Sequence, residues 1–146
     1  MNRFDHYIYM DHSATTPVLK EVADTVYDAM TLYFGNASEP HTLGAESHKI
    51  LEDSRKTIAK ALNASPEEIV FTSGGTESNN MAIFGIVEAY FRKGNHIITS
   101  EIEHPAVHIP LKILENEGFK ITYIPIDKYG IVNPDDIRKS IQPDTI

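Results

Sequence analysis

Apolar residues recur at helical spacing in two long segments near the start of the chain. The first segment opens at Thr16-Pro17 and ends at Gly35, and its apolar stripe consists of Val18, Val22, Val26, Ala29 and Tyr33. The second ends at about Asn63, and its stripe consists of Leu43, Ile50, Leu51, Ile58, Ala61 and Leu62. Each stripe predicts an amphipathic helix that covers a hydrophobic core with one face.

Beyond Asn63 the pattern changes to short apolar runs that alternate with helical stretches. The runs predict strands at 68–73, 96–100 and 119–126, and the stretches between them predict helices over 76–94 and 104–118. Asn133 and Pro134 are typical of another helix start, and Thr145 and Ile146 resemble the first residues of a further strand. This alternation predicts an α/β fold made of parallel βαβ units with right-handed crossovers.

Composition narrows the range of partners and environments. The chain has 13 basic and 21 acidic residues, a net charge of −8, and no basic stripe, which argues against nucleic acid as a partner. No run is long enough to cross a membrane, and the start of the chain lacks the apolar stretch of a signal peptide, so we expect a cytoplasmic protein. The absence of cysteine excludes a disulfide framework and thiolate zinc sites.

The stretch "FTSGGTESNN" places two glycines where a predicted strand ends and a helix begins. Open α/β sheets bind ligands at this position, and a helix start offers free N–H groups to a phosphate. Thr76 and Ser78 could add hydroxyl donors. An ordinary glycine turn with a helix cap explains the glycines equally well. The spacing fits neither a P-loop nor a G-x-G-x-x-G motif, so the ligand is not expected to be ATP or NAD.

A second group of polar residues, "EIEHPAVH", follows the next predicted strand. His104 precedes Pro105, a suitable first residue of a helix, and therefore lies over the same sheet edge as the glycine turn. Zinc would require a third ligand, which the sequence does not indicate, so we predict no metal site. Two alternatives stay open for His104. It is a capping or core histidine, or it stacks on and exchanges protons with a planar ligand.

Five blocks of the sequence, in order and spacing, resemble the N-terminal part of the pyridoxal-phosphate-dependent cysteine desulfurases, in the class V aminotransferase superfamily. They cover nearly the whole chain: "IYMDHSATTPV", "FGNASEPHTLGAESHKILEDSRKTIAKAL", "EIVFTSGGTESNNMAI", "HIITSEIEHPAV" and "GFKITYIPIDKYGIV". The resemblance implies the aspartate-aminotransferase type of fold (fold type I). Residues 1–15 would belong to its small domain, and residues 16–146 would form the first part of its mostly parallel, cofactor-binding large domain.

The resemblance also implies roles for three residues. Gly75 and Thr76 would bind the phosphate of pyridoxal 5'-phosphate, and His104 would stack on the pyridine ring and act as an acid/base group. Family members are homodimers that convert L-cysteine to L-alanine. They pass the sulfur, held as a persulfide on an enzyme cysteine, to an iron–sulfur scaffold or another sulfur acceptor.

Several family residues have no counterpart in this sequence. The cofactor-linking lysine, the partner of the ring nitrogen, the substrate-binding arginine and the catalytic cysteine all lie further along the family sequence than Ile146. Ser47-His48-Lys49 imitates the lysine motif, but it precedes the phosphate turn and fits a solvated helix. Ala37 stands where the family usually has proline.

These departures leave more than one interpretation of the function. The chain is the N-terminal part of a cysteine desulfurase that is inactive by itself, or it is a non-catalytic remnant or docking module. A third interpretation keeps the superfamily but changes the reaction, for example to that of a selenocysteine lyase.

Overall fold

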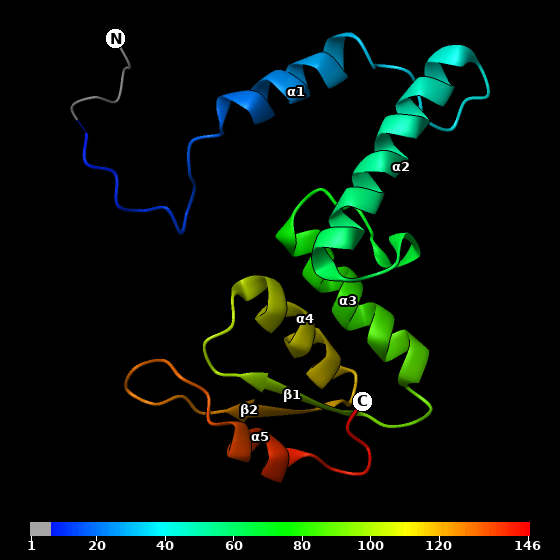
Figure 1. Ribbon diagram of the computed structural model, residues 1–146. Helices are drawn as coiled ribbons and strands as arrows, with labels where there is room; N and C mark the ends of the chain where they lie inside the picture. The colour runs from blue at the N-terminus through cyan, green and yellow to red at the C-terminus, as the bar shows by residue number, and fades with distance from the viewer. Residues whose placement is uncertain (1–6) are drawn as a thin grey trace. The chain divides into compact units, whose positions relative to one another are not determined.

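The computed structural model describes residues 7–146, and the chain divides into two compact units between Val70 and Phe71 (Figure 1). The first unit contains helix α1 (Lys20–Thr31), helix α2 (Thr42–Leu62) and the short 3-10 helix η1 (Pro66–Glu68). The second contains α3 (Gly75–Tyr90), β1 (His96–Ser100), α4 (Pro105–Asn116), β2 (Lys120–Ile124) and α5 (Pro134–Ser140).

Helix α2 has a well-defined start and end. The imidazole Nδ1 of His41 accepts a hydrogen bond from the N–H of Gly44 at 3.2 Å, and Asn63 ends the helix in the left-handed conformation with a φ of 53°. A Cβ at Gly44 would lie 2.2 Å from the carbonyl oxygen of Glu39, so only glycine fits there. The second predicted helix is therefore confirmed, together with its end at Asn63.

The sheet of the second unit consists of two parallel strands. β1 and β2 pair in register from His96 opposite Lys120 to Ser100 opposite Ile124. Helices α4 and α5 lie on opposite faces of the pair, as Figure 1 shows. On the free side of β1, Thr145 forms a parallel bridge with His96. Thr145 thus adds one parallel bridge beside β1, and the further strand expected at Thr145 and Ile146 stays a prediction.

The core of the second unit lies under α4. Ala106, Leu111 and Leu114 face it with exposed fractions of 6%, 1% and 1%, and Ile124 of β2 is 2% exposed. Spacings of three to five residues place the three α4 side chains on one helix face. α3 packs against α4, yet none of its residues is buried, although the helix is rich in apolar side chains.

A buried histidine links β1 to both of its neighbours. The His96 side chain is fully buried, and its two ring nitrogens lie 2.7 Å from the hydroxyl oxygens of Thr122 and Thr145. One nitrogen of a neutral imidazole donates and the other accepts, which two hydroxyls can satisfy together. His96 therefore joins β1, β2 and the C-terminal segment through one side chain.

One predicted strand is wrong. Within the described residues, 68–73 contain the end of η1 and irregular backbone but no strand. An extended segment becomes a strand only when a neighbouring strand pairs with it in a ladder, and the strand pairing of the described part does not include these residues. The α/β class is confirmed by the second unit and by the structural relatives reported below. The division at residues 15 and 16 stays a prediction, and residues 1–6 lie outside the described part.

Helix α1 is shorter than predicted. It begins at Lys20, after an extended Leu19, and ends at Thr31. Among the described residues, no helix combines the length and the apolar character needed to cross a bilayer.

Replacing His96 with alanine is expected to lower the free energy of unfolding by about 1–3 kcal/mol, because the hydroxyls of Thr122 and Thr145 lose their buried partner. Urea denaturation followed by circular dichroism measures the change. The matched control is His48→Ala, which removes an exposed imidazole from α2. Equal stability of the two variants would contradict the assignment of His96 as a buried link.

Candidate functional site

The turn before α3 leaves backbone donors free. Gly74, in extended conformation, is the N-cap residue of α3 and offers no side chain to cap it. Within residues 7–146, the N–H groups of Gly75 and Thr76 make no hydrogen bond. α4 and α5 differ, because the side chains of His104 and Asn133 accept hydrogen bonds from their first turns. The start of α3 thus presents two N–H donors and the positive end of the helix dipole.

The space in front of these donors is open. A Cβ added to Gly74 or to Gly75 would meet no atom within 4 Å. The Thr76 side chain is exposed and lies next to the two N–H groups in sequence. Two N–H donors, a hydroxyl and a partial positive charge suit a phosphate group.

A carboxylate from the first turn of α3 binds the residue that precedes the two glycines. Glu77 Oε2 accepts hydrogen bonds from the backbone N–H of Ser73 at 2.6 Å and from its hydroxyl at 2.7 Å. These bonds, first the one from the hydroxyl and then the one from the N–H, lower the pKa of Glu77. Sequence analysis missed this residue. The available signal was an acidic residue in the first helical turn, four positions after a serine.

Ser78 does not serve as a free donor. Its hydroxyl lies 2.7 Å from the hydroxyl of Thr72 and 3.2 Å from the carbonyl oxygen of Gly74. The side chain therefore fastens the turn to the helix, and the expectation that Ser78 binds phosphate is dropped. Thr76 remains the hydroxyl of the turn.

His104 is the N-cap residue of α4. Its Nδ1 accepts a hydrogen bond from the N–H of Ala106 at 3.0 Å. An accepting Nδ1 places the proton of the neutral ring on Nε2. The structure thus shows that His104 caps α4 and leaves Nε2 as the ring atom that can face a ligand, and the stacking and acid/base role of His104 stays a prediction.

The other polar residues of this loop serve the fold. Glu103 Oε1 accepts from the hydroxyl of Ser100 at 2.7 Å. His108 stacks on Tyr123 with ring centroids 5.8 Å apart, and its Nε2 lies 3.3 Å from the carbonyl oxygen of Glu101. In the described part of the chain, no three potential metal ligands come together. His104, with no partner for its Nε2 among the described residues, is the histidine that directly follows the turn after β1.

The fold brings the glycine turn and His104 to the same end of the second unit. α3 and α4 pack against each other, and both begin on the side toward which the arrow of β1 points (Figure 1). In parallel βαβ units this is the carboxyl edge of the sheet, where ligands bind. The structure thus places Gly75, Thr76 and His104 at the starts of two adjacent helices.

Lys49 behaves as an ordinary surface lysine. Its side chain is 78% exposed, and its Nζ lies 2.6 Å from Asp53 one helical turn later. The hydrogen bond to Asp53, together with its charge, raises the pKa of Lys49. The amine therefore stays protonated, which opposes attack on an aldehyde.

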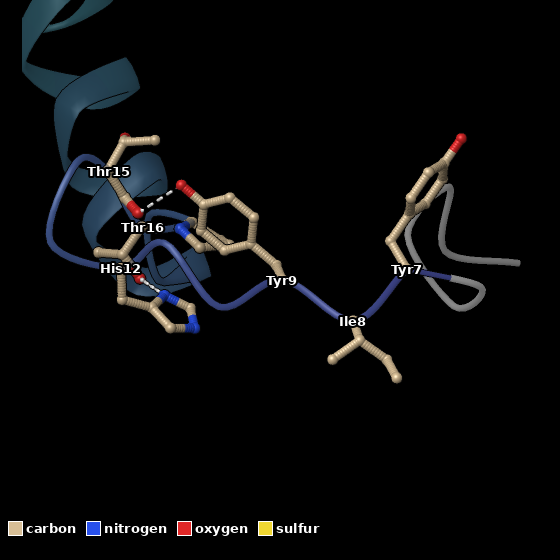
Figure 2. Close-up of a pocket in the computed structure, with 7 residues that line it drawn as sticks. Tyr7, Ile8, Tyr9, His12, Thr15 and Thr16 are labelled. Atoms are coloured by element: carbon tan, nitrogen blue, oxygen red, sulfur yellow. Dashed lines mark hydrogen bonds between the residues drawn. The ribbon is translucent and has the colours of Figure 1, made fainter.

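A hollow of about 600 Å³ lies in the N-terminal segment of the first unit (Figure 2). The Tyr9 hydroxyl closes this loop by donating to the carbonyl oxygens of Asp11 and Thr15 at 2.9 and 3.0 Å. The rings of His12 and Tyr9 pack edge to face, and the Nδ1 atom of His12 forms a hydrogen bond with the hydroxyl group of Thr16. The hollow is lined by Tyr7, Ile8, Tyr9, His12, Thr15, Thr16 and Pro17. None of the predicted site residues is among them.

Comparison with known proteins shows the family of the chain. The family model for aminotransferase class V matches residues 8–146. The chain belongs to this family. It is 50% identical over 139 residues to the cysteine desulfurase IscS of Dictyoglomus turgidum, a match that covers 95% of the chain and 35% of the relative.

Solved structures give the same result. A NifS-like protein superposes with a TM-score of 0.91 at 36% identity, covering 95% of this chain and 38% of its own. SspA in complex with cysteine superposes with a TM-score of 0.88 at 36% identity, and the match covers 94% of this chain and 40% of the SspA chain. The class V chain thus spans little more than a third of the length of these relatives.

Class V aminotransferases depend on pyridoxal phosphate, and the turn before α3 fits the phosphate of that cofactor. The donors are unpaired, the space before the glycines is open, and the nearby carboxylate of Glu77 is turned back to Ser73. Gly75 and Thr76 are the residues that would hold the phosphate.

The carboxylate of Glu77 is expected to titrate below the ordinary range of glutamate, because Ser73 donates two hydrogen bonds to its charged form. The contribution of these bonds to stability is present above the ordinary pKa and is lost as the pH falls through the lowered pKa. NMR titration of the side-chain carboxyl carbon measures the midpoint. In Ser73→Ala the midpoint should rise, and an unchanged midpoint would contradict the assigned cause.

Proposed function

We propose that this chain is the N-terminal part of a pyridoxal-phosphate-dependent cysteine desulfurase, in which it supplies the phosphate site and a histidine beside the cofactor ring. The observation that supports this proposal most directly is that the N–H groups of Gly75 and Thr76 are free at the open start of α3. Family membership supports the proposal, as do relatives named cysteine desulfurase.

The residues of this chain have different proposed roles in cofactor binding and in the reaction. Gly75 and Thr76 bind and orient the phosphate through two N–H groups and one hydroxyl, which fixes the position of the attached ring. His104 stands at the start of the neighbouring helix with its proton on Nε2, where it can stack and donate a hydrogen bond, and it can take up a proton at Nδ1 when the cap is released. When bound, pyridoxal phosphate acts as an electron sink for the amino acid substrate. The linking lysine and the sulfur-accepting cysteine are expected outside this segment.

The partners of the whole enzyme are part of the proposal. L-cysteine is the proposed substrate, a choice supported by the solved relative SspA in complex with cysteine. We further propose a cytoplasmic homodimer that delivers sulfur to an iron–sulfur scaffold or another sulfur acceptor. The small-domain role of residues 1–15 belongs to the same proposal.

Thr76→Val, made in a full-length enzyme that carries this segment, is expected to lower the affinity for pyridoxal phosphate about ten- to a hundredfold. The lost hydrogen bond to a charged phosphate is worth about 1.5–3 kcal/mol. Turnover at saturating cofactor should fall much less, because the hydroxyl contributes to binding and not to the reaction. Fluorescence titration of the apoenzyme measures the affinity, and Thr76→Ser, which keeps the hydroxyl, is the control. Unchanged affinity in Thr76→Val would contradict the phosphate assignment.

His104→Asn in the same enzyme is expected to slow alanine release on the order of a hundredfold while cofactor still binds, because a general acid/base group is lost. Asparagine is a good N-cap residue, so the cap on α4 and the melting temperature should be retained. Single-turnover kinetics and thermal melts measure the two effects. Normal turnover in this variant would limit His104 to its structural role.

The isolated chain is expected to form no specific covalent link to pyridoxal phosphate, because no lysine occupies the family's linking position and Lys49 is a surface residue of α2 paired with Asp53. Borohydride reduction followed by peptide mass spectrometry should find no single dominant modified lysine. Stoichiometric modification of Lys49 would overturn the alignment of this chain with the family.

A further inference from the structure

We propose that Glu77 is a positioning residue for the phosphate site: its carboxylate holds Ser73 so that the N–H groups of Gly75 and Thr76 stay free for the ligand. The proposal rests on the proposed function, because it assigns a role toward the phosphate bound at Gly75 and Thr76.

The geometry of the turn supports this role. Two adjacent glycines precede and begin α3, and neither has a side chain to restrict its backbone. The segment therefore needs an external restraint to present its N–H groups in one direction. Glu77 supplies it, because its Oε2 receives both the N–H of Ser73 at 2.6 Å and the Ser73 hydroxyl at 2.7 Å. The two bonds fix the residue before the glycines to the first turn of the helix after them.

The same contact keeps competing groups away from the ligand. The Ser73 N–H is occupied, so the anion is directed to the free donors that follow, which include those of Gly75 and Thr76. The carboxylate is also occupied. Its oxygen points to Ser73 and not into the open space before the glycines. Glu77 thus remains next to an anion site without entering it.

Charge alone predicts the opposite effect of this residue. A carboxylate in the first turn of α3 repels a phosphate at the same helix end, so its removal would raise the affinity for phosphate. Positioning predicts that its removal lowers the affinity, since the ligand must then order the glycine turn itself. Repulsion predicts a higher phosphate affinity after removal of the carboxylate and positioning predicts a lower one, so substitutions at residue 77 distinguish the two explanations.

Three variants test the proposal in the 146-residue chain. Glu77→Gln removes the charge but keeps an acceptor oxygen at the same reach. Glu77→Asp keeps the charge but is one methylene too short to reach Ser73 in the same way. Glu77→Ala removes both. Glu88→Ala, an exposed glutamate further along the same helix, is the matched control.

The readout is the affinity for pyridoxal 5'-phosphate relative to pyridoxal, which lacks the phosphate. It is measured from the amide NMR shifts of Gly75 and Thr76 during titration. The Ser73 amide reports in the same spectra whether its hydrogen bond is intact. A purely structural loss would weaken both ligands alike, whereas loss of positioning weakens only the phosphorylated one.

Positioning predicts an affinity for pyridoxal phosphate about two- to thirtyfold lower in Glu77→Ala, the range expected for a lost helix-start restraint. Glu77→Asp should bind more weakly still, because it keeps the repelling charge. Glu77→Gln should bind at least as tightly as the parent chain, because it keeps the acceptor oxygen without that charge, and Glu88→Ala should stay near the parent chain. Tighter binding in both Glu77→Ala and Glu77→Gln would overturn the proposal in favour of charge alone, as would equal losses for pyridoxal and pyridoxal phosphate.

The experiment distinguishes failure of the proposed phosphate site from failure of the role assigned to Glu77. If the parent chain shows no preference for pyridoxal phosphate over pyridoxal at Gly75 and Thr76, both the phosphate site and the role of Glu77 are overturned. If the preference exists and Thr76→Val reduces it, but Glu77→Ala does not, only the role of Glu77 is overturned.

Discussion

The first N–H groups of an α-helix have no partner within the helix, and this constraint organises the second unit of the protein. α4 and α5 satisfy it with the side chains of His104 and Asn133, but α3 leaves the N–H groups of Gly75 and Thr76 open. A missing cap is not enough to make a site, because α1 also begins without one. The start of α3 differs by its two glycines, the open space before them and the carboxylate that holds the turn.

The parallel strands determine where these helix starts lie. Each helix of a parallel βαβ unit returns the chain to the other end of the sheet, so helices that follow strands begin at its carboxyl edge. Leu111 and Leu114 anchor α4 to the core, and α3 packs against α4. The buried His96 fixes β1 between β2 and the C-terminal segment through two hydroxyls. His104 therefore lies at the carboxyl end of β1, and the packing of α3 against α4 brings the glycine turn to the same end of the unit.

Local patterns in the sequence were enough to predict most of the elements and the position of the site. The two glycines before a helical stretch and Pro105 after His104 are signals confined to a few residues, and both helix starts were found. The strand at 68–73 was predicted wrongly because an apolar run shows β propensity but does not show whether a neighbour pairs with it. The contact between Glu77 and Ser73 depends on one side-chain rotamer, which composition and spacing do not determine. α3 is an apolar helix without a buried residue, and which element covers its apolar face is likewise decided by tertiary packing and not by local sequence.

His104 shows how a structural role limits a chemical one. Its Nδ1 holds the N–H of Ala106, so the proton of the neutral ring lies on Nε2. In this state the ring can donate from Nε2 but has no lone pair there to accept a proton. To act as a base, the imidazole must release the cap on α4 and accept at Nδ1, because loss of the Nε2 proton from the neutral ring would leave an imidazolate. The cap therefore orients the ring and favours a hydrogen-bond donor at the site, and proton transfer through His104 has to be accompanied by release of the cap.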